Sequence, residues 1–182
     1  MAPNLSPCGI MGSNMSALEG RAASDTTERT PGRIRVIGVG NILLKDEGVG
    51  IHLVRELEKL ELPAGVEVID GGVAGLQLLD YLDGARKVIF VDAAALGGQP
   101  GDIARFTPGE VASANAPGLS LHQTGIAEVL SLATALGKCP PVVIFGIQPK
   151  EIDWGLEMSP EVRASLGRLV EMVLQELATS PP

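Results

Sequence analysis

From residue 33 onward the chain alternates short apolar segments with amphipathic ones, and this alternation most constrains its fold. The expected strands cover residues 33–38, 66–69, 87–91 and 142–145, and the expected helices cover residues 49–60, 76–82, 126–136 and 160–177. Alternating strands and helices are typical of a mostly parallel sheet with helices on both faces. We therefore predict a single α/β domain.

One further apolar segment, residues 103–106, follows the third strand after a turn-rich loop with no helix. A parallel neighbour would need a crossover connection, so this segment is a candidate antiparallel strand. The last helix has a clear start at Ser159-Pro160-Glu161, with a capping serine, a proline at the first helical position and an acid in the first turn.

The ends of the chain differ in composition from the part between them. Residues 1–31 are rich in small and polar residues and have no strand or helix period, so we expect a disordered N-terminal extension. The α/β domain is then expected at 32–178, followed by a short tail at 179–182. No apolar run approaches the roughly 20 residues that a membrane-spanning helix needs, and residues 1–31 lack the apolar core of a signal peptide.

Charge and cysteine content exclude some partners. The formal net charge is −8, which argues against nucleic acid and membrane as partners because both favour a basic surface. Cys8 and Cys139 match no disulfide or metal spacing, as expected for thiols in a reducing cytosol. We therefore predict a cytoplasmic protein.

The turn after the first expected strand begins like a nucleotide-binding loop and then departs from it. The strand runs into Gly38-x-Gly40, but the third glycine of a G-x-G-x-x-G fingerprint would fall at Leu43. Two acids follow instead, Asp46 and Glu47, at the start of the first helix. Asp46 suits the helix N-cap, and Glu47 suits either the first helical turn or a ligand position.

Polar residues also follow the other parallel strands, at the edge where open α/β sheets bind ligands. Asp70, Asp92 and Gln148 stand at strand ends, and His122 precedes a helix. Asp70 also fits an ordinary turn and His122 a structural role, whereas a carboxylate at a central strand such as Asp92 is costly without a partner. One imidazole and two carboxylates suit nickel or zinc, or general acid–base catalysis without a metal. The second histidine, His52, is expected to be solvated.

Five motifs in this order and spacing resemble the [NiFe]-hydrogenase maturation endopeptidases, over about residues 33–177. They are the run from Gly38 to Gly50, Asp70-Gly71-Gly72-Val73-Ala74-Gly75, Val91-Asp92-Ala93, Leu121-His122-Gln123-Thr124-Gly125, and Gly146-Ile147-Gln148-Pro149. The resemblance implies a twisted five-stranded sheet between helices. It also implies a protease that removes the C-terminal extension of a hydrogenase large-subunit precursor after nickel insertion.

The same resemblance implies roles for particular residues. Glu47, Asp92 and His122 match the residues that contact metal and serve catalysis in the family, and Asp70-Gly71-Gly72 matches a region associated with substrate recognition. The implied cofactor is nickel supplied by the substrate, and zinc or cadmium could substitute for it. Three alternatives stay open: a protease with a resident metal, a non-catalytic chaperone that binds the precursor, and a related peptidase with another protein substrate.

Overall fold

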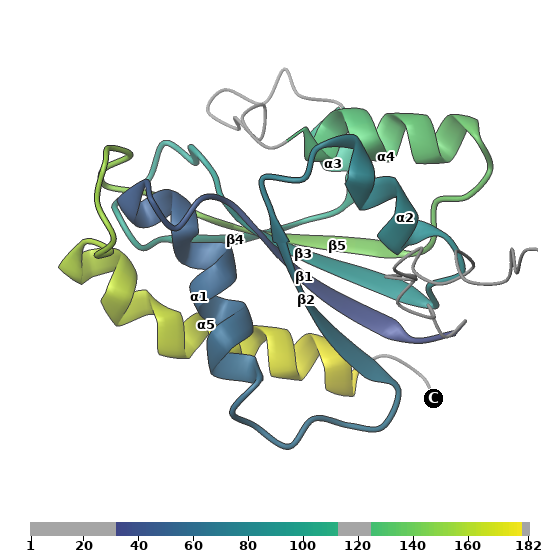
Figure 1. Cartoon of the computed structure of the whole chain (residues 1–182), viewed down its shortest axis with the longest axis horizontal. Helices are drawn as coiled ribbons and strands as arrows, with labels where there is room; N and C mark the ends of the chain where they lie inside the picture. Colours follow the sequence, from purple (N-terminus) through teal and green to yellow (C-terminus); the bar gives the residue numbers. More distant parts are fainter. Residues whose placement is uncertain (1–31, 113–124, 180–182) are drawn as a thin grey trace, which may run out of the picture.

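The computed structural model describes residues 32–112 and 125–179. In this part of the chain, five strands form one twisted sheet in the order β2-β1-β3-β5-β4 (Figure 1). The strands are β1 (Ile34–Val39), β2 (Val66–Gly72), β3 (Lys87–Ala93), β4 (Ile103–Phe106) and β5 (Val142–Ile147). β4 pairs antiparallel with β5 and the other pairs are parallel, which confirms the predicted fold class.

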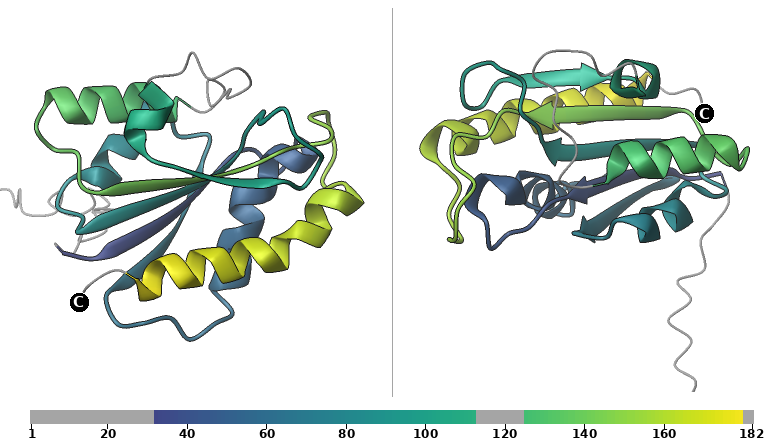
Figure 2. Two further views of the ribbon diagram at one scale, coloured as in Figure 1. Left: turned by 180° about the vertical axis from the view of Figure 1, so that it is seen from behind. Right: turned by 90° about the horizontal axis from the view of Figure 1, so that it is seen from above.

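Helices cover both faces of the sheet, as predicted. They are α1 (Val49–Leu57), α2 (Leu79–Leu82), α3 (Pro108–Ala112), α4 (Ile126–Ala135) and α5 (Pro160–Ala178), with 3₁₀ turns η1 (Lys45–Gly48) and η2 (Leu76–Leu78). Figure 2 shows α1 and α5 on one face of the sheet and α2 and α4 on the other. The short helix α3 was not predicted from the sequence.

The strand period of two explains this layering, because successive side chains point to opposite faces. In β1, Ile34 and Val36 pack in the core under α1 and α5, whereas Ile37 and Val39 pack in the core under α2 and α4. All six residues of β1 are buried, as expected for a parallel strand covered on both faces.

Three strands, β2, β3 and β5, are longer than the sequence predicted, and two of them, β2 and β3, continue through an aspartate. β2 includes Asp70, which pairs with Gly38, and β3 includes Asp92, which pairs with Gly146. Backbone pairing with an adjacent parallel strand extends each strand past the end of its apolar run. The two aspartates therefore lie in the last residues of the sheet and not in the loops beyond it.

The start of α5 agrees with the prediction. Ser159 is the N-cap, its Oγ accepts a hydrogen bond from the backbone N–H of Val162 at 3.5 Å, and Pro160 is the first helical residue. No helix in the described ranges is long and apolar enough to cross a membrane. Residues 1–31 and 180–182 lie outside those ranges, so the predicted extension and most of the predicted tail stay predictions.

Candidate active site

The glycines of the first motif let the turn after β1 pack backbone to backbone against the sheet. Gly40 has a φ of 131°, and a Cβ there would lie 1.9 Å from the carbonyl oxygen of Glu47. A Cβ on Gly50 would lie 2.4 Å from the carbonyl oxygens of both Val39 and Val91. The space beside these glycines is filled by the protein's own backbone, so the turn presents its side chains and does not cradle a phosphate.

Asp46 is fully buried and joins this turn to the loop between β5 and α5. Its carboxylate accepts hydrogen bonds from the backbone N–H groups of Lys150 (2.9 Å), Glu151 (3.0 Å) and Ser159 (2.7 Å) and from the Ser159 hydroxyl (2.9 Å). Burial alone would raise the pKa of Asp46, but these donors outweigh it and hold the pKa below its usual value. The prediction that Asp46 caps α1 was wrong, because Gly48 occupies the N-cap position.

Glu47, the next residue, has the opposite environment. Its side chain is half-buried, and Oε2 is shielded from solvent and accepts no hydrogen bond from any described residue. Burial raises the pKa of this carboxyl group above its usual value. A desolvated carboxylate oxygen without a hydrogen-bond donor is stabilised by a cation or a proton. Glu47 is therefore a candidate ligand for a cation.

Asp92 is fully buried at the carboxyl end of β3. By strand alternation it lies on the same face as Phe90, which packs in the core under α2 and α4. The turn that carries Glu47 reaches β3 through Gly50, which sits against the carbonyl oxygen of Val91. The structure therefore brings two of the predicted site residues, Glu47 and Asp92, to the carboxyl ends of the adjacent strands β1 and β3.

His122 lies outside the described residues. Gly125, three residues after it, is the N-cap of α4 with a φ of 69°, and a Cβ on it would lie 3.8 Å from the Cα of Gly75. Within 32–112 and 125–179, no group of three histidine, cysteine or acidic side chains is placed to hold a metal ion. A site with three protein ligands would need a residue beyond these ranges, and the set Glu47, Asp92 and His122 stays a prediction.

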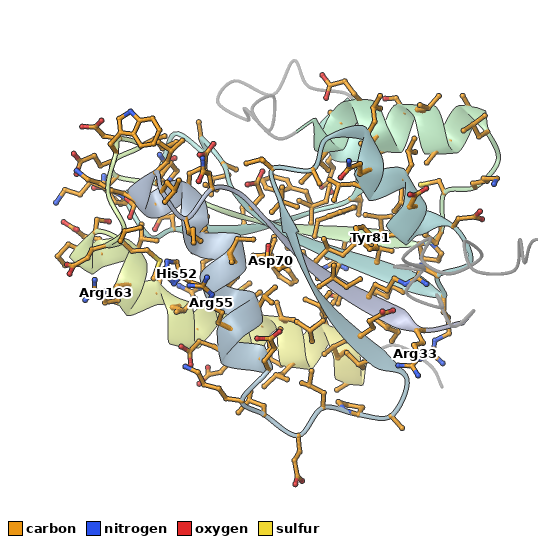
Figure 3. The ribbon with its side chains drawn as sticks, in the orientation of Figure 1. Arg33, His52, Arg55, Asp70, Tyr81 and Arg163 are labelled. Carbon is orange, nitrogen blue, oxygen red and sulfur yellow. The ribbon has the colours of Figure 1, made fainter. Side chains whose placement is uncertain are left out.

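Asp70 lies on the other side of β1, at the end of β2 (Figure 3). It is exposed, and its Oδ1 accepts a hydrogen bond from the backbone N–H of Gly72 at 3.0 Å. Residues 70–77 line an open cleft of about 580 Å³. A smaller cleft of about 160 Å³, lined partly by Asp70 and Gly40, joins this region to the glycine turn. In the predicted recognition segment, Asp70 is thus accessible and next to the first motif, whereas Gly71 is buried.

His52 differs from its prediction, since it is not freely solvated. It is half-buried, and its Nε2 is shielded from solvent without a hydrogen-bond partner among the described residues. Burial lowers the pKa of His52, and the positive charges of Arg55 and Arg163 lower it further. Figure 3 shows these three residues near the helix pair α1 and α5, and His52 lines neither of the two clefts near Asp70.

Gln148 has a structural role that its position did not reveal. Its Oε1 accepts hydrogen bonds from the backbone N–H groups of Leu96 (2.6 Å) and Gly97 (3.0 Å), and its Nε2 donates to the carbonyl oxygen of Pro149 (3.0 Å). Gln148 therefore fixes the loop that follows Asp92. Leu96 and Gly97 are about fifty residues away from Gln148 in the sequence, so no local pattern predicts these two hydrogen bonds.

Comparison with known proteins identifies relatives over most of the chain. The family model described as hydrogenase maturation protease, HycI, matches residues 51–176. The hydrogenase expression/formation protein HupD of Bradyrhizobium diazoefficiens is 40% identical over 156 residues, which cover 84% of this chain and 81% of that protein. The hydrogenase 2 maturation protease of Escherichia coli is 36% identical over 151 residues, covering 81% and 92%.

Solved structures agree with these relatives. The hydrogenase maturating endopeptidase HybD from Escherichia coli has a TM-score of 0.72 and 36% identity, covering 80% of this chain and 92% of its own. The [NiFe] hydrogenase maturation protease HybD from Thermococcus kodakarensis has a TM-score of 0.67 and 28% identity, covering 80% and 99%. The motifs, the five-stranded fold and these matches lead to one conclusion: the chain belongs to the hydrogenase maturation protease family.

Proposed function

We propose that this protein is an endopeptidase that removes the C-terminal extension of a [NiFe]-hydrogenase large-subunit precursor after nickel has been inserted. Glu47, Asp92 and His122 recognise the nickel that the precursor carries. Family membership supports proteolysis in hydrogenase maturation. The observation that carries the metal role is the solvent-shielded Oε2 of Glu47, which accepts no hydrogen bond from a described residue.

The chemistry of Glu47 favours a cation. Its carboxyl group has a raised pKa because it is desolvated, and a divalent cation removes that cost by supplying positive charge. Nickel binds both carboxylate oxygen and imidazole nitrogen, which are the donors offered by the three proposed residues. Glu47 is held on a turn that packs against β1 and β3, so little rearrangement is needed when the cation arrives.

In the proposed reaction, the precursor brings nickel held by its own cysteines, and Glu47, Asp92 and His122 complete the coordination. Nickel held there would polarise the scissile carbonyl as a Lewis acid, and water attacks the carbonyl carbon. A C–O bond forms and the C–N bond breaks. One proton of water stays with the new carboxyl group, and the other passes to the leaving amine. A precursor without nickel lacks the contact that assembles the site, so it stays uncut.

The open cleft along residues 70–77 is the proposed seat of the C-terminal extension. Asp70 stands at its edge, and Val73 and Leu76 leave 74% and 64% of their surfaces exposed. An extended peptide can place its backbone amides near Asp70 and its apolar side chains on Val73 and Leu76. This arrangement gives the Asp70-Gly71-Gly72 segment its proposed role in substrate recognition.

Cleavage of nickel-loaded precursor by single variants tests the assignment of residues. Glu47→Gln, Asp92→Asn and His122→Ala should each lower the cleavage rate at least about a hundredfold, the usual scale for losing a group that acts in the transition state. Glu58→Gln, an exposed acid after α1, is the control and should cleave normally. Full activity in all three site variants, each folded, would reject the site.

A resident metal that activates water is the second candidate, because the same three residues would hold it. Metal analysis of the purified protein separates the two schemes. Nickel carried by the substrate predicts less than about 0.1 metal ion per chain together with cleavage of loaded precursor. One bound zinc ion whose removal stops cleavage would favour the resident metal.

A further inference from the structure

Four exposed apolar side chains gather where the turn after β1 meets the loop after β5. They are Leu43 (47% exposed), Ile152 (42%), Trp154 (75%) and Leu156 (65%), and we call them the tryptophan surface. The two segments are joined by backbone hydrogen bonds from Gly155 N–H to the Leu43 carbonyl and from Lys45 N–H to the Gly155 carbonyl, both 2.9 Å. The tryptophan surface is therefore formed by residues that are far apart in sequence and adjacent in space.

Hydrogen bonds and an ion pair hold together the two segments that carry the tryptophan surface. The buried carboxylate of Asp46 binds the backbone at Lys150, Glu151 and Ser159, and Lys45 Nζ forms an ion pair with Glu151 at 2.6 Å. Figure 1 shows the loop between β5 and α5 beside the start of α1. An exposed tryptophan on a backbone segment held in place is a common anchor of protein interfaces, because little conformational entropy is lost when the tryptophan is buried.

Charged side chains border the tryptophan surface. Glu151, Asp153 and Glu157 are exposed beside its apolar residues. Glu151 is paired with Lys45 at 2.6 Å and Glu157 with Arg163 at 3.7 Å, so the border carries charges of both signs. An apolar centre with a charged rim is typical of a protein interface, and its place on the turn that carries Glu47 favours the substrate protein as the partner.

We propose that the tryptophan surface docks the folded body of the large-subunit precursor, on a face that has an apolar pocket. This inference rests on the proposed function. Leu43 and Glu47 belong to the same turn, so a partner seated on Leu43 and Trp154 is brought to the mouth of the candidate site. Binding energy from this surface then positions the scissile segment without contacting it.

Fluorine NMR can observe this docking directly, because Trp154 is the only tryptophan in the sequence. The protein is labelled with 5-fluorotryptophan and titrated with unlabelled, nickel-free precursor, which the proposed mechanism leaves uncut. The single resonance of Trp154 should shift and broaden in proportion to complex formed, as followed in parallel by calorimetry. A complex that leaves the resonance unchanged, or no complex at tens of micromolar, would overturn the proposal.

A dilution series without precursor tests the other occupant of the surface. The resonance should stay constant with protein concentration. A concentration-dependent shift accompanied by dimer formation would assign the surface to a second copy of the chain and refute docking of the precursor.

Kinetic variants separate this inference from the proposed function. Trp154→Ser and Leu156→Ser should raise KM for nickel-loaded precursor at least about tenfold, as expected when an interface anchor is lost, and leave kcat unchanged. The controls Leu60→Ser and Leu136→Ser also remove exposed leucines, away from this surface, and should leave both constants unchanged. Normal KM in the first pair would defeat docking while cleavage stands. A shifted Trp154 resonance with no cleavage by the wild type would defeat the proposed function while docking stands.

Discussion

Asp46 and Glu47 are adjacent acids with different physical roles. Asp46 is fully buried and receives hydrogen bonds from Lys150, Glu151 and Ser159, whereas Oε2 of Glu47 receives none from the described residues. The sequence favoured a structural role for Asp46 and a ligand role for Glu47, but it assigned Asp46 the wrong contact, a helix N-cap. The donors to Asp46 lie 104 to 113 residues further along the chain, beyond the reach of any local pattern.

Asp46→Ala should lower the free energy of unfolding by about 3 kcal/mol, because it leaves the buried backbone N–H of Ser159 and the partly buried backbone N–H of Glu151 without acceptors. Urea denaturation of wild type and variant measures the loss. Glu58→Ala, which removes an exposed acid, is the control and should change stability by less than about 0.5 kcal/mol. An equally small effect for Asp46→Ala would mean that its hydrogen bonds contribute little.

Glu47→Gln should leave the protein as stable as the wild type or slightly more stable. The pKa of Glu47 is raised above its ordinary value of 4.5, so the folded state binds the proton more tightly and the wild type loses stability as pH rises above about 4.5. The variant has no such charge to desolvate. Its stability relative to the wild type should therefore increase from pH 4 to pH 7 in parallel thermal melts. A variant less stable at pH 7 than at pH 4, relative to wild type, would contradict the raised pKa.

At the scale of elements, the turn after β1 and the start of α1 fit the sheet only because particular residues lack a side chain. Gly50 lies against the carbonyl oxygens of Val39 and Val91, on two different strands. The sequence indicated that these glycines shape a turn. The sheet order β2-β1-β3 determines which strands α1 packs against, and the sequence alone did not predict this order.

Gly50→Ala should destabilise the fold by about 3 kcal/mol or more, since its Cβ would lie 2.4 Å from both oxygens and α1 would have to move. Gly167→Ala is the matched control, because Gly167 lies within α5 with no atom within 4 Å of the added Cβ. That control should stabilise the protein by about 0.5–1 kcal/mol. Similar unfolding midpoints for the two variants would refute the backbone contact of Gly50.

The C-terminal helix is tied to the sheet by an ion-pair network centred on Glu176. Its carboxylate pairs with Lys87 of β3 at 2.5 Å and with Arg105 of β4 at 2.8 Å, and the hydrogen bond from Arg105 is the main cause that lowers the pKa of Glu176 to about 2. The stabilisation from Glu176 is therefore complete above its ordinary pKa of 4.5 and is lost as pH falls toward 2.

Glu176→Gln should accordingly cost about 1–3 kcal/mol of stability at pH 7, with the lower part of this range reflecting the exposure of Arg105. The difference from the wild type should shrink between pH 4.5 and pH 2 in chemical denaturation at several pH values. A difference that stays constant across this window would mean that charge pairing is not its source.

At the scale of the whole molecule, the sequence predicted more of the fold than of the site. The apolar runs located all five strands, and the short connection before residues 103–106 identified the antiparallel edge strand, because a parallel strand needs a longer crossover. Sequence position also placed Glu47 and Asp92 at one edge of the sheet. It could not predict the burial of His52 or the partners of Asp46 and Gln148, which depend on tertiary contacts.

For the whole molecule acting on its substrate, we propose that cleavage depends on nickel in the precursor and that Glu47 senses this nickel. The most direct measurement follows release of the C-terminal peptide by mass spectrometry under single-turnover conditions, using one precursor preparation with and without nickel. The wild type should release the peptide only from nickel-loaded precursor, and Glu47→Gln should release it from neither. Equal release of the peptide by the wild type from nickel-loaded and nickel-free precursor would contradict nickel-dependent cleavage.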